Sequence, residues 1–150
     1  MKIGELASLT GTAIETIRFY EREKLLQAPR RTGANYRVYQ TVDADRLAFI
    51  RHCRSLDMTL DEIRALLRFA DDPQQNCRGV NELLDEHIGH VAERIRELRV
   101  LEKELKRLRL CCQAEQAVTD CGIFTGLTKA SRTPVAQPLT GHVHGSHGRR

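Results

Sequence analysis

Apolar residues recur at helical spacing in two short segments at the start of the chain. The pattern runs over residues 3–9 and 13–20, and Thr10, Gly11 and Thr12 interrupt it. This predicts two helices joined by a tight turn, with a polar face on the second helix that suits a DNA major groove. Because such helix pairs also occur in proteins that do not bind DNA, the pattern alone makes DNA binding one hypothesis among others.

The next segment, residues 26–39, has the composition of a hairpin. Pro29, Gly33 and Asn35 favour turns, and a short β-prone run ends the segment at residues 36–39. Arginines and tyrosines are interleaved here, which supplies positive charge and hydroxyl groups for a phosphate backbone. We predict a two-stranded wing that contacts DNA. The alternative is a solvated hairpin whose tyrosines cover the core.

Two further helices are predicted over residues 42–56 and 59–69. Thr59 is suited to cap the second helix, because its hydroxyl can accept a bond from a free backbone N–H in the first turn. Cys53 falls within the first helix. We expect it to be a core residue, since a free cysteine packs as a small apolar side chain.

A long helix is predicted from Val80 to about Leu110. Its apolar residues form a narrow stripe on an otherwise charged surface. They are Val80, Leu84, Ile88, Val91, Ile95 and Leu98, and after a phase slip at Leu101 the stripe continues through Leu105 and Leu108 to Cys112. Since little chain remains to cover this stripe, a coiled coil between two subunits is favoured over packing within one chain.

Composition and charge indicate the compartment and the partner. With 41% hydrophobic and 29% charged residues, the chain has the composition of a soluble globular protein. No segment approaches the roughly 18 apolar residues of a membrane span, so we expect a cytoplasmic protein with no membrane partner. Residues 1–56 contain ten Lys and Arg against six Asp and Glu, whereas residues 57–150 contain fourteen of each. The positive excess therefore lies in the N-terminal third, as expected for a nucleic-acid-binding module.

The cysteines point to metal binding between subunits. An odd number of cysteines, five, in a cytoplasmic protein argues for free thiols or metal ligands. Eight residues separate Cys112 from Cys121, a loop short enough to present both thiolates to one ion. Cys77 precedes the long helix and lies about 50 Å from Cys112 at roughly 1.5 Å per residue. If two long helices pair head to tail, Cys77 of one subunit meets Cys112 and Cys121 of the other.

Three sulfur ligands select soft or borderline ions, namely Cd(II), Pb(II), Zn(II) or Hg(II). Cys111 projects about 100° away from Cys112 on a helix, which makes it a spare or outer ligand. A disulfide between Cys121 and either Cys111 or Cys112 is the chemical alternative, in which the protein senses thiol oxidation.

The histidines suggest a second metal site. His87 and His90 are three residues apart on one side of the long helix. The end of the chain adds His142, His144 and His147. Glu62 is a further candidate ligand, although the sequence does not define its place relative to His87. The alternative is that the helix histidines are exposed and bind nothing.

These elements define a fold class and a domain plan. The fold is expected to be mainly α: an N-terminal winged helix-turn-helix, a long antiparallel coiled-coil dimerisation helix and a short metal-binding loop. The expected parts are the DNA-binding domain (1–70), a linker (71–79), the dimerisation helix (80–112), the metal-binding loop (113–125) and a disordered histidine-containing tail (126–150). The tail is expected to be disordered because Gly, Ser, Thr and Pro dominate it.

Three motifs resemble the mercury-resistance regulator (MerR) family. They are Ile3-Gly4-Glu5-Leu6-Ala7, Thr16-Ile17-Arg18-Phe19-Tyr20-Glu21 and Asn35-Tyr36-Arg37-Val38-Tyr39. The resemblance covers about residues 1–124, and Cys77, Cys112 and Cys121 match the family's sensing cysteines with their intervals. The His87 and His90 pair and the histidine tail are similar to the cadmium-responsive CadR and lead-responsive PbrR branch, which places Cd(II) first. The Cys111-Cys112 doublet is instead similar to zinc-responsive members.

This resemblance implies a homodimer on a palindromic promoter operator. It represses without metal and activates with it, by distorting the DNA so that RNA polymerase aligns with both promoter elements. The DNA-contacting residues implied are Thr16, Arg18, Tyr20, Tyr36, Arg37 and Tyr39. A thiol redox regulator and a soluble metal-sequestering protein are the alternatives. An enzyme is not expected, because no nucleophile and base pair, phosphate loop or open metal triad occurs at interpretable spacing.

Overall fold

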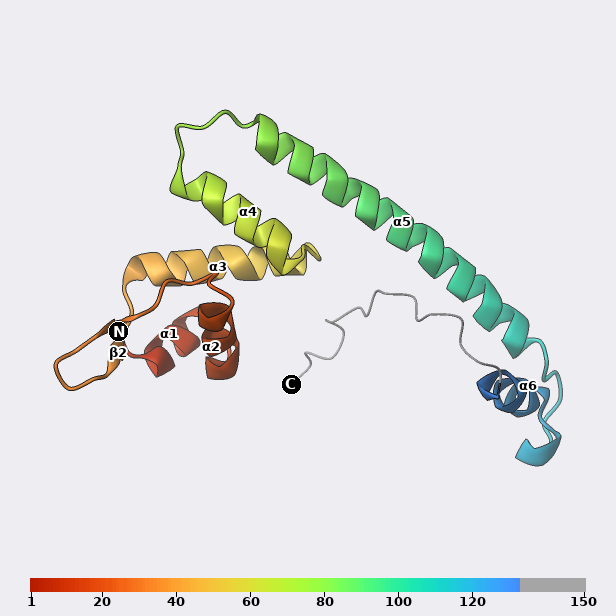
Figure 1. The fold of residues 1–150 in the computed structure, drawn as a ribbon. Helices are drawn as coiled ribbons and strands as arrows, with labels where there is room; N and C mark the ends of the chain where they lie inside the picture. Colours follow the sequence, from red (N-terminus) through yellow and green to blue (C-terminus); the bar gives the residue numbers. More distant parts are fainter. Residues whose placement is uncertain (133–150) are drawn as a thin grey trace. The chain divides into compact units, whose positions relative to one another are not determined.

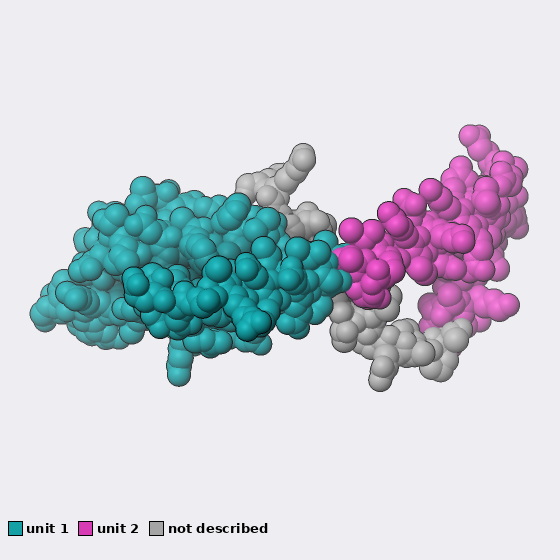
Figure 2. All heavy atoms as spheres, turned by 90° about the horizontal axis from the view of Figure 1, so that it is seen from above, with its two compact units in different colours: residues 1–91 teal, residues 92–150 magenta. Residues whose placement is uncertain are grey.

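The computed structural model describes residues 1–132, which are mostly helical and include a small two-stranded wing (Figure 1). The elements are α1 (Ile3–Thr10), α2 (Ile14–Arg22), β1 (Arg30–Arg31), β2 (Arg37–Val38), α3 (Thr41–Ser55), α4 (Leu60–Asp71), α5 (Arg78–Arg109), the 3-10 helix η1 (Val118–Asp120) and α6 (Gly122–Ser131). The chain divides into two compact units, the first of residues 1–91 and the second of residues 92–150 (Figure 2). None of the helices in residues 1–132 combines the length and the apolar character that a membrane crossing needs.

α1 and α2 form the predicted helix pair. Gly11 adopts a left-handed conformation, with φ of 59°, so that its backbone N–H bonds to the carbonyl of Ala7 and ends α1. Thr10 is buried and its hydroxyl donates to the carbonyl of Leu6 at 2.7 Å. This turn fixes the start of α2, whose Ile17 is fully buried.

β1 and β2 form the predicted wing. The strands are antiparallel, with Arg30 opposite Val38 and Arg31 opposite Arg37. Asn35 reverses the chain between them with φ of 63°, a conformation that asparagine tolerates better than most residues. The mainly helical fold with a small wing is therefore confirmed.

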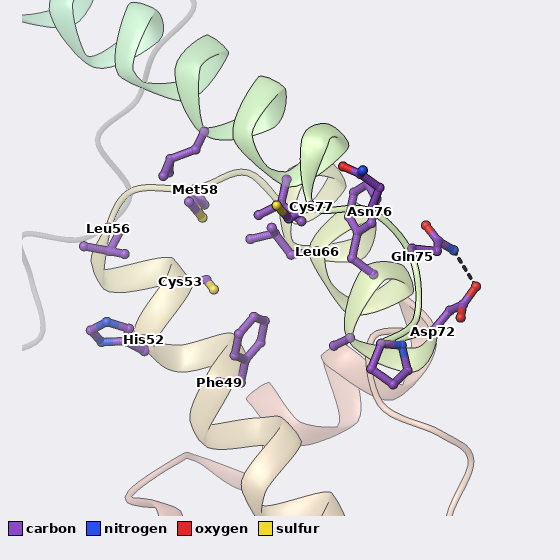
Figure 3. Close-up of a pocket in the computed structure, with 15 residues that line it drawn as sticks. Phe49, His52, Cys53, Leu56, Met58, Leu66, Asp72, Gln75, Asn76 and Cys77 are labelled. Atoms are coloured by element: carbon purple, nitrogen blue, oxygen red, sulfur yellow. Dashed lines mark hydrogen bonds between the residues drawn. The ribbon is translucent and has the colours of Figure 1, made fainter.

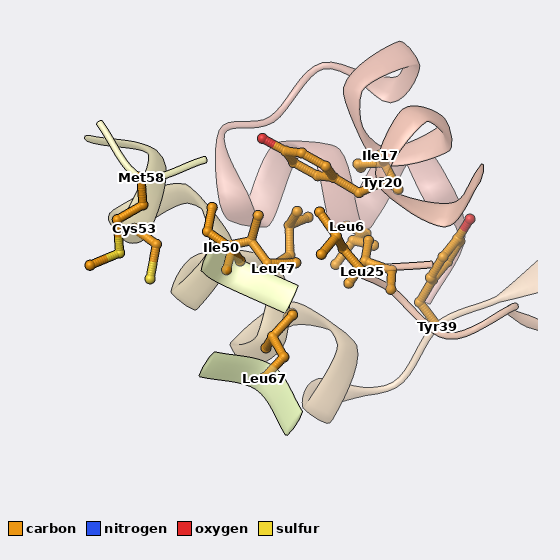
Figure 4. Packing of buried hydrophobic residues seen from close by; sticks show 13 residues of the cluster. Leu6, Ile17, Tyr20, Leu25, Tyr39, Leu47, Ile50, Cys53, Met58 and Leu67 are labelled. Carbon is orange, nitrogen blue, oxygen red and sulfur yellow. The ribbon is translucent and has the colours of Figure 1, made fainter. Parts of the chain in front are cut away.

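The core of the first unit lies among α1, α2, α3 and α4 (Figure 4). Its largest fully buried side chains are Leu6, Ile17, Leu25, Leu47, Ile50 and Ile63. Cys53 belongs to this cluster, as predicted for a packing cysteine. Thr59 caps α4 as predicted: its Oγ1 accepts from the N–H of Glu62, and the Glu62 carboxylate accepts from the N–H of Thr59.

α5 begins at Arg78 rather than Val80 and runs without interruption to Arg109. Near its start, Gly79 lets the ring of Phe69 pack directly on the helix, since an added Cβ would lie 2.5 Å from the ring. The apolar stripe is largely exposed in the single chain. Its exposed members are Leu84, Ile88, Val91, Ile95, Leu98, Leu101 and Leu105. A stripe of this kind is stabilised when a partner buries it.

The segment after α5 differs from the prediction. A loop to residue 125 and a disordered tail from residue 126 were expected, but the structure has η1 at Val118–Asp120 and α6 at Gly122–Ser131. The Gly, Thr and Ser content of α6 obscured the helix, which packs on α5: an added Cβ on Gly126 would lie 3.4 Å from Leu108. The loop that carries Cys112 and Cys121 is therefore bounded by a helix at each end.

Candidate functional site

α2 presents one polar face to solvent. Ile17 and Tyr20 are buried beneath it, whereas Arg18 is exposed and Thr16 is half-buried. Exposed donors on the helix that follows a tight turn are the groups that helix-turn-helix proteins place in a major groove. The geometry therefore leaves Arg18 free to contact DNA.

The wing offers a second cationic surface. Arg30, Arg31, Tyr36 and Arg37 are all exposed. Arg31 is oriented by a hydrogen bond from Nη1 to Oδ1 of Asn35 at 2.7 Å. Exposed guanidinium and hydroxyl groups are the usual donors to phosphate oxygens, so the wing suits the DNA backbone rather than the base edges.

Tyr20 and Tyr39 lie in the core, which corrects their expected place at the DNA. The two residues are 7% and 2% exposed, respectively. The Tyr39 hydroxyl donates to Oε1 of Glu21, and Oε2 of Glu21 lies 3.8 Å from Nε of Arg37. Burial and the Glu21 carboxylate raise the pKa of Tyr39 far above its ordinary value, so the hydroxyl keeps its proton. The Glu21 carboxylate thus connects the Tyr39 hydroxyl to Arg37 of the wing. The expected DNA contacts that remain accessible are Thr16, Arg18, Tyr36 and Arg37.

In the second unit, the Cys112 side chain lies close enough to the Cys121 thiol to influence its pKa. The pKa of the Cys121 thiol is lowered, chiefly because the backbone N–H of Phe124 donates to it. The N–H of Ile123, the Cys112 side chain and the positive charge of Arg109 act in the same direction. Thiolate is the form that binds soft metals, and these neighbours favour it.

The thiols of Cys111, Cys112 and Cys77 have different surroundings. Sγ of Cys111 faces the carbonyl of Arg107 at 3.7 Å, whereas Sγ of Cys112 faces the carbonyl of Ala114 at 3.4 Å. The two neighbouring thiols therefore face different backbone carbonyl groups. Cys77 is exposed in the first unit and directly precedes α5.

Glu62, His87 and His90 bring their ligand atoms together in the first unit. One ligand atom from each lies within 4.8 Å of the other two. Nδ1 of His87 is 3.1 Å from Oε2 of Glu62, and Nδ1 of His90 is 3.4 Å from Oε1. The His87 residue is 7% exposed, so it is not the exposed helix histidine of the alternative interpretation. The structure also places Glu62, which the sequence could not.

The carbonyl of Leu56 holds the other ring nitrogen of His87. Nε2 lies 2.8 Å from this oxygen, and a carbonyl only accepts, so Nε2 carries the proton. Metal-binding histidines are commonly held in this way through the nitrogen remote from the ion. Nδ1, which faces Glu62, is then the ring nitrogen that could bind a metal ion. Sequence reasoning missed Leu56 because a backbone carbonyl leaves no signature in residue type.

Glu62 both caps the first turn of α4 and contacts the two histidines of α5. Its Oε2 accepts from the N–H of Thr59 at 2.8 Å, while the carboxylate faces both histidines. Burial alone raises the pKa of Glu62, but the Thr59 N–H and the two histidines outweigh it and lower the pKa. The carboxylate is therefore ionised at neutral pH, as a metal ligand requires, and it links α5 to the first turn of α4.

The surroundings of this trio also favour a cation. A cavity of about 490 Å³ beside Glu62 and His90 is lined by Asp61, Glu82 and Glu86. Concentrated negative charge of this kind attracts cations. The other predicted ligands, His142, His144 and His147, lie outside the described residues.

Comparison with known proteins places the chain in a family. The models described as "MerR HTH family regulatory protein" and "MerR, DNA binding" match residues 1–70 and 44–108. A ZntR homolog from Haemophilus influenzae is 45% identical over 109 residues, which cover 73% of this chain and 81% of the relative. The transcriptional regulator ZntR of Escherichia coli K12 is 34% identical over 132 residues, which cover 87% and 94%.

Solved structures agree with these matches. PbrR691 from Ralstonia metallidurans CH34, in complex with lead(II), is 47% identical with a TM-score of 0.73, covering 85% of this chain and 98% of that one. MerR from Bacillus megaterium MB1, in complex with mercury(II), is 33% identical with a TM-score of 0.63, covering 85% and 99%. Such proteins are DNA-binding regulators and not enzymes. The chain belongs to the MerR family of helix-turn-helix transcription regulators, among relatives of the ZntR and PbrR type.

Proposed function

We propose that the protein is a metal-responsive transcription regulator that represses a promoter without metal and activates it, by distorting the DNA, when a soft ion is bound. MerR-family regulators act as dimers that bind promoter DNA, which favours this role over metal sequestration. The exposed stripe of α5 is the surface that a second copy would bury. RNA polymerase is the partner that would respond to the distorted promoter.

The observation that carries the proposal is the contact between Cys112 and Cys121. The Cys112 side chain lies close enough to the Cys121 thiol to lower its pKa, and two such thiols suit adjacent positions of a soft-metal site. Cys77 is assigned as the third ligand. It precedes a helix of 32 residues, which measures about 48 Å, so the Cys77 that completes the site belongs to the antiparallel partner.

Cd(II) is the first candidate ion, followed by Pb(II) and then Zn(II) or Hg(II). Three thiolates suit each of these ions and exclude Mg(II) and Ca(II). The support from relatives is broad: PbrR691 has been solved with lead(II) and the Bacillus megaterium MerR with mercury(II). Promoter induction with the four ions at matched free concentrations would rank them, and equal induction by all would contradict a selective sensor.

Mixed dimers test the shared site directly. Cys77→Ser and Cys112→Ser homodimers each lack one ligand in both sites, so neither should show the cadmium–thiolate absorption band. When the two variants are mixed and allowed to exchange subunits, the heterodimer regains one complete site, and part of the band should return. Cys111→Ser is the matched control and should keep the full band. No recovery on mixing would contradict a site built from two chains.

A second cation site is assigned to Glu62, His87 and His90, with the histidines of the C-terminal segment as additional ligands. Its support is the convergence of three ligand atoms in acidic surroundings. In a Cys112→Ser background, one metal ion per chain should remain bound and should be lost on adding His90→Ala. His52→Ala changes an exposed histidine on α3 and should leave that ion in place. Equal loss in both variants would contradict the assignment.

The contact between Cys112 and Cys121 also favours a second candidate function, a thiol redox switch. In this function, the two thiols pass two electrons and two protons to an oxidant and form a disulfide, and no metal is needed. A promoter reporter separates the two functions. A metal sensor responds to cadmium, loses this response when a chelator is added and does not respond to diamide. A redox switch responds to diamide, keeps this response when a chelator is added and does not respond to cadmium.

A further inference from the structure

Cys111 and Gly122 form the neck of the loop that carries Cys112 and Cys121. Cys111 directly precedes Cys112 just after α5, and Gly122 directly follows Cys121 as the first residue of α6. A Cβ added to Gly122 would overlap the carbonyl oxygen of Cys111 and lie 3.2 Å from its carbonyl carbon. The two backbones are therefore in direct contact, and glycine is the residue that allows this approach because it has no Cβ.

Both sides of the neck are anchored to the helix beside them. The N–H of Cys111 donates to the carbonyl of Leu108 at 3.0 Å, which extends the last turn of α5. On the other side, the carbonyl of Cys121 accepts from the N–H of Thr125 at 3.1 Å and from the Thr125 hydroxyl at 3.2 Å. A Cβ at position 122 would meet main-chain atoms, which cannot turn away as a side chain can. A larger residue would therefore open the neck.

The neck joins the two sides of the loop, whereas two hydrogen bonds within the loop are local. Nη1 of Arg109 donates to the carbonyl of Cys112 at 2.8 Å, and Nε2 of Gln116 donates to the carbonyl of Asp120 at 2.8 Å. Each of these bonds connects residues three or four apart, so it shapes one side of the loop. The contact between positions 111 and 122 spans the whole loop and lies immediately outside the two proposed ligands.

The neck uses the backbone of Cys111 and not its thiol. Sγ of Cys111 faces the carbonyl of Arg107, on the last turn of α5. Cys77, the third proposed ligand, lies in the first unit, where it lines an apolar cavity (Figure 3). Within the second unit, the spacing of the Cys112 and Cys121 thiols is therefore left to their own segment.

We propose that Gly122 is a positioning residue for the soft-metal site, because its contact with the Cys111 backbone sets the spacing of the Cys112 and Cys121 thiols. This role rests on the proposed metal-sensing function. Gly122 binds no ion itself and acts through the two ligands beside the neck. Ligands bind one ion well when the surrounding structure holds them within about 0.5 Å of the productive geometry. Opening the neck thus weakens binding although every thiol is still present.

Gly122→Ala tests this role, with Gly126→Ala as the matched control on the same helix. A Cβ at Gly126 would lie 3.4 Å from Cδ1 of Leu108, the end of a flexible side chain that can shift. Both substitutions favour the helix to the same extent, so they differ in what the new Cβ meets.

The cadmium–thiolate absorption band, followed in competition with a chelator, measures the affinity of the site in the full chain. Gly122→Ala should weaken cadmium binding at least about tenfold, and Gly126→Ala should stay within about twofold of the wild type. Circular dichroism should show that both variants keep their helix content. Equal losses of affinity in the two variants would overturn the role of Gly122, since they would assign the effect to α6 as a whole.

A second measurement needs no metal and so separates this role from the proposed function. Diamide takes two electrons and two protons from Cys112 and Cys121 and leaves a disulfide, which forms readily when the thiols are close. In a Cys77→Ser, Cys111→Ser background, Gly122→Ala should slow this reaction at least about tenfold relative to Gly126→Ala. Mass mapping of the peptides identifies the bond.

An unchanged rate of disulfide formation would overturn the role of Gly122, even with weaker cadmium binding. Slower disulfide formation in Gly122→Ala, together with a wild-type chain that binds no cadmium through its thiols, would contradict the proposed function instead. In that case Gly122 would still set the spacing of the two thiols.

Discussion

Nε2 of His87, on α5, donates a hydrogen bond across 2.8 Å to the carbonyl oxygen of Leu56, the C-cap residue of α3. The other side of the same ring faces Glu62, which caps the start of α4. One buried imidazole therefore joins three helices of the first unit. Its removal affects the fold as well as the proposed second metal site.

His87→Ala should lower the free energy of unfolding by about 1–3 kcal/mol without any metal, because it leaves the Leu56 carbonyl unpaired and a void beside it. His90→Ala should change stability by no more than about 0.5 kcal/mol, since the His90 side chain is 61% exposed. Urea denaturation of the metal-free proteins measures both effects. A larger loss in His90→Ala than in His87→Ala would contradict the geometry.

Two glycines of α5 should respond to the same substitution in opposite directions. Gly79→Ala places a Cβ 2.5 Å from the Phe69 ring and should cost about 1–3 kcal/mol through the shift it forces. Gly89→Ala meets nothing within 4 Å and should stabilise the helix by about 0.5–1 kcal/mol. Thermal unfolding curves compare them. Equal Tm values would show that Phe69 does not pack on Gly79 as described.

Arg18→Ala and Arg37→Ala should each weaken operator binding. If either arginine contacts a phosphate, the slope of log K against log salt concentration becomes shallower by about 0.9. Arg99→Ala, an exposed arginine on α5, is the control and should leave affinity and slope unchanged. Fluorescence anisotropy at several salt concentrations gives these values. An unchanged slope with lower affinity would assign that arginine to base contact.

Asp71 should make stability depend on pH at the acidic end. Arg46 donates to it from Nη1 and Nη2 at 2.7 and 3.2 Å and holds the pKa of Asp71 below its ordinary value of 3.8. Because the folded pKa is lower than the unfolded one, the stabilisation is present above the unfolded value and is lost as pH falls through the folded value. At pH 7, Asp71→Asn should cost less than about 1 kcal/mol, since the carboxylate is half exposed.

Denaturation of both proteins across the acidic range measures this effect. The difference between wild type and Asp71→Asn should shrink as the pH falls below 3.8. Asp85→Asn, at an exposed position on α5, should show no such pH-dependent difference. A difference that grows on acidification would contradict the sign derived from the Arg46 contact.

The local pattern of residues along the sequence was sufficient to predict most of the fold. The apolar spacing placed α1 to α5 within a few residues, Thr59 marked the start of α4, and the cysteine of α3 proved to be a core residue. These features depend on neighbours in the chain, so periodicity and capping chemistry contain the information. The wing was found for the same reason, through Asn35 and the β-prone run that follows it.

Features set by packing were not predictable from pattern. Tyr20 and Tyr39 carry hydroxyls that suit DNA, yet their rings complete the core, and residue type cannot tell these uses apart. α6 was missed because Gly122 and Gly126 are poor helix formers, and it is contact with α5 that favours the helix. Glu62 and His87 are far apart in sequence, so only the packing of α4 on α5 brings them together.

The apolar stripe on α5 also has a consequence for gene dosage. A single chain leaves these leucines and isoleucines in water, and the population of paired chains rises with the square of the free subunit concentration. A binding site completed by a second copy is therefore scarce in a cell that makes few copies. The side chains of one helix would then set the expression level below which the cell cannot respond to the ion.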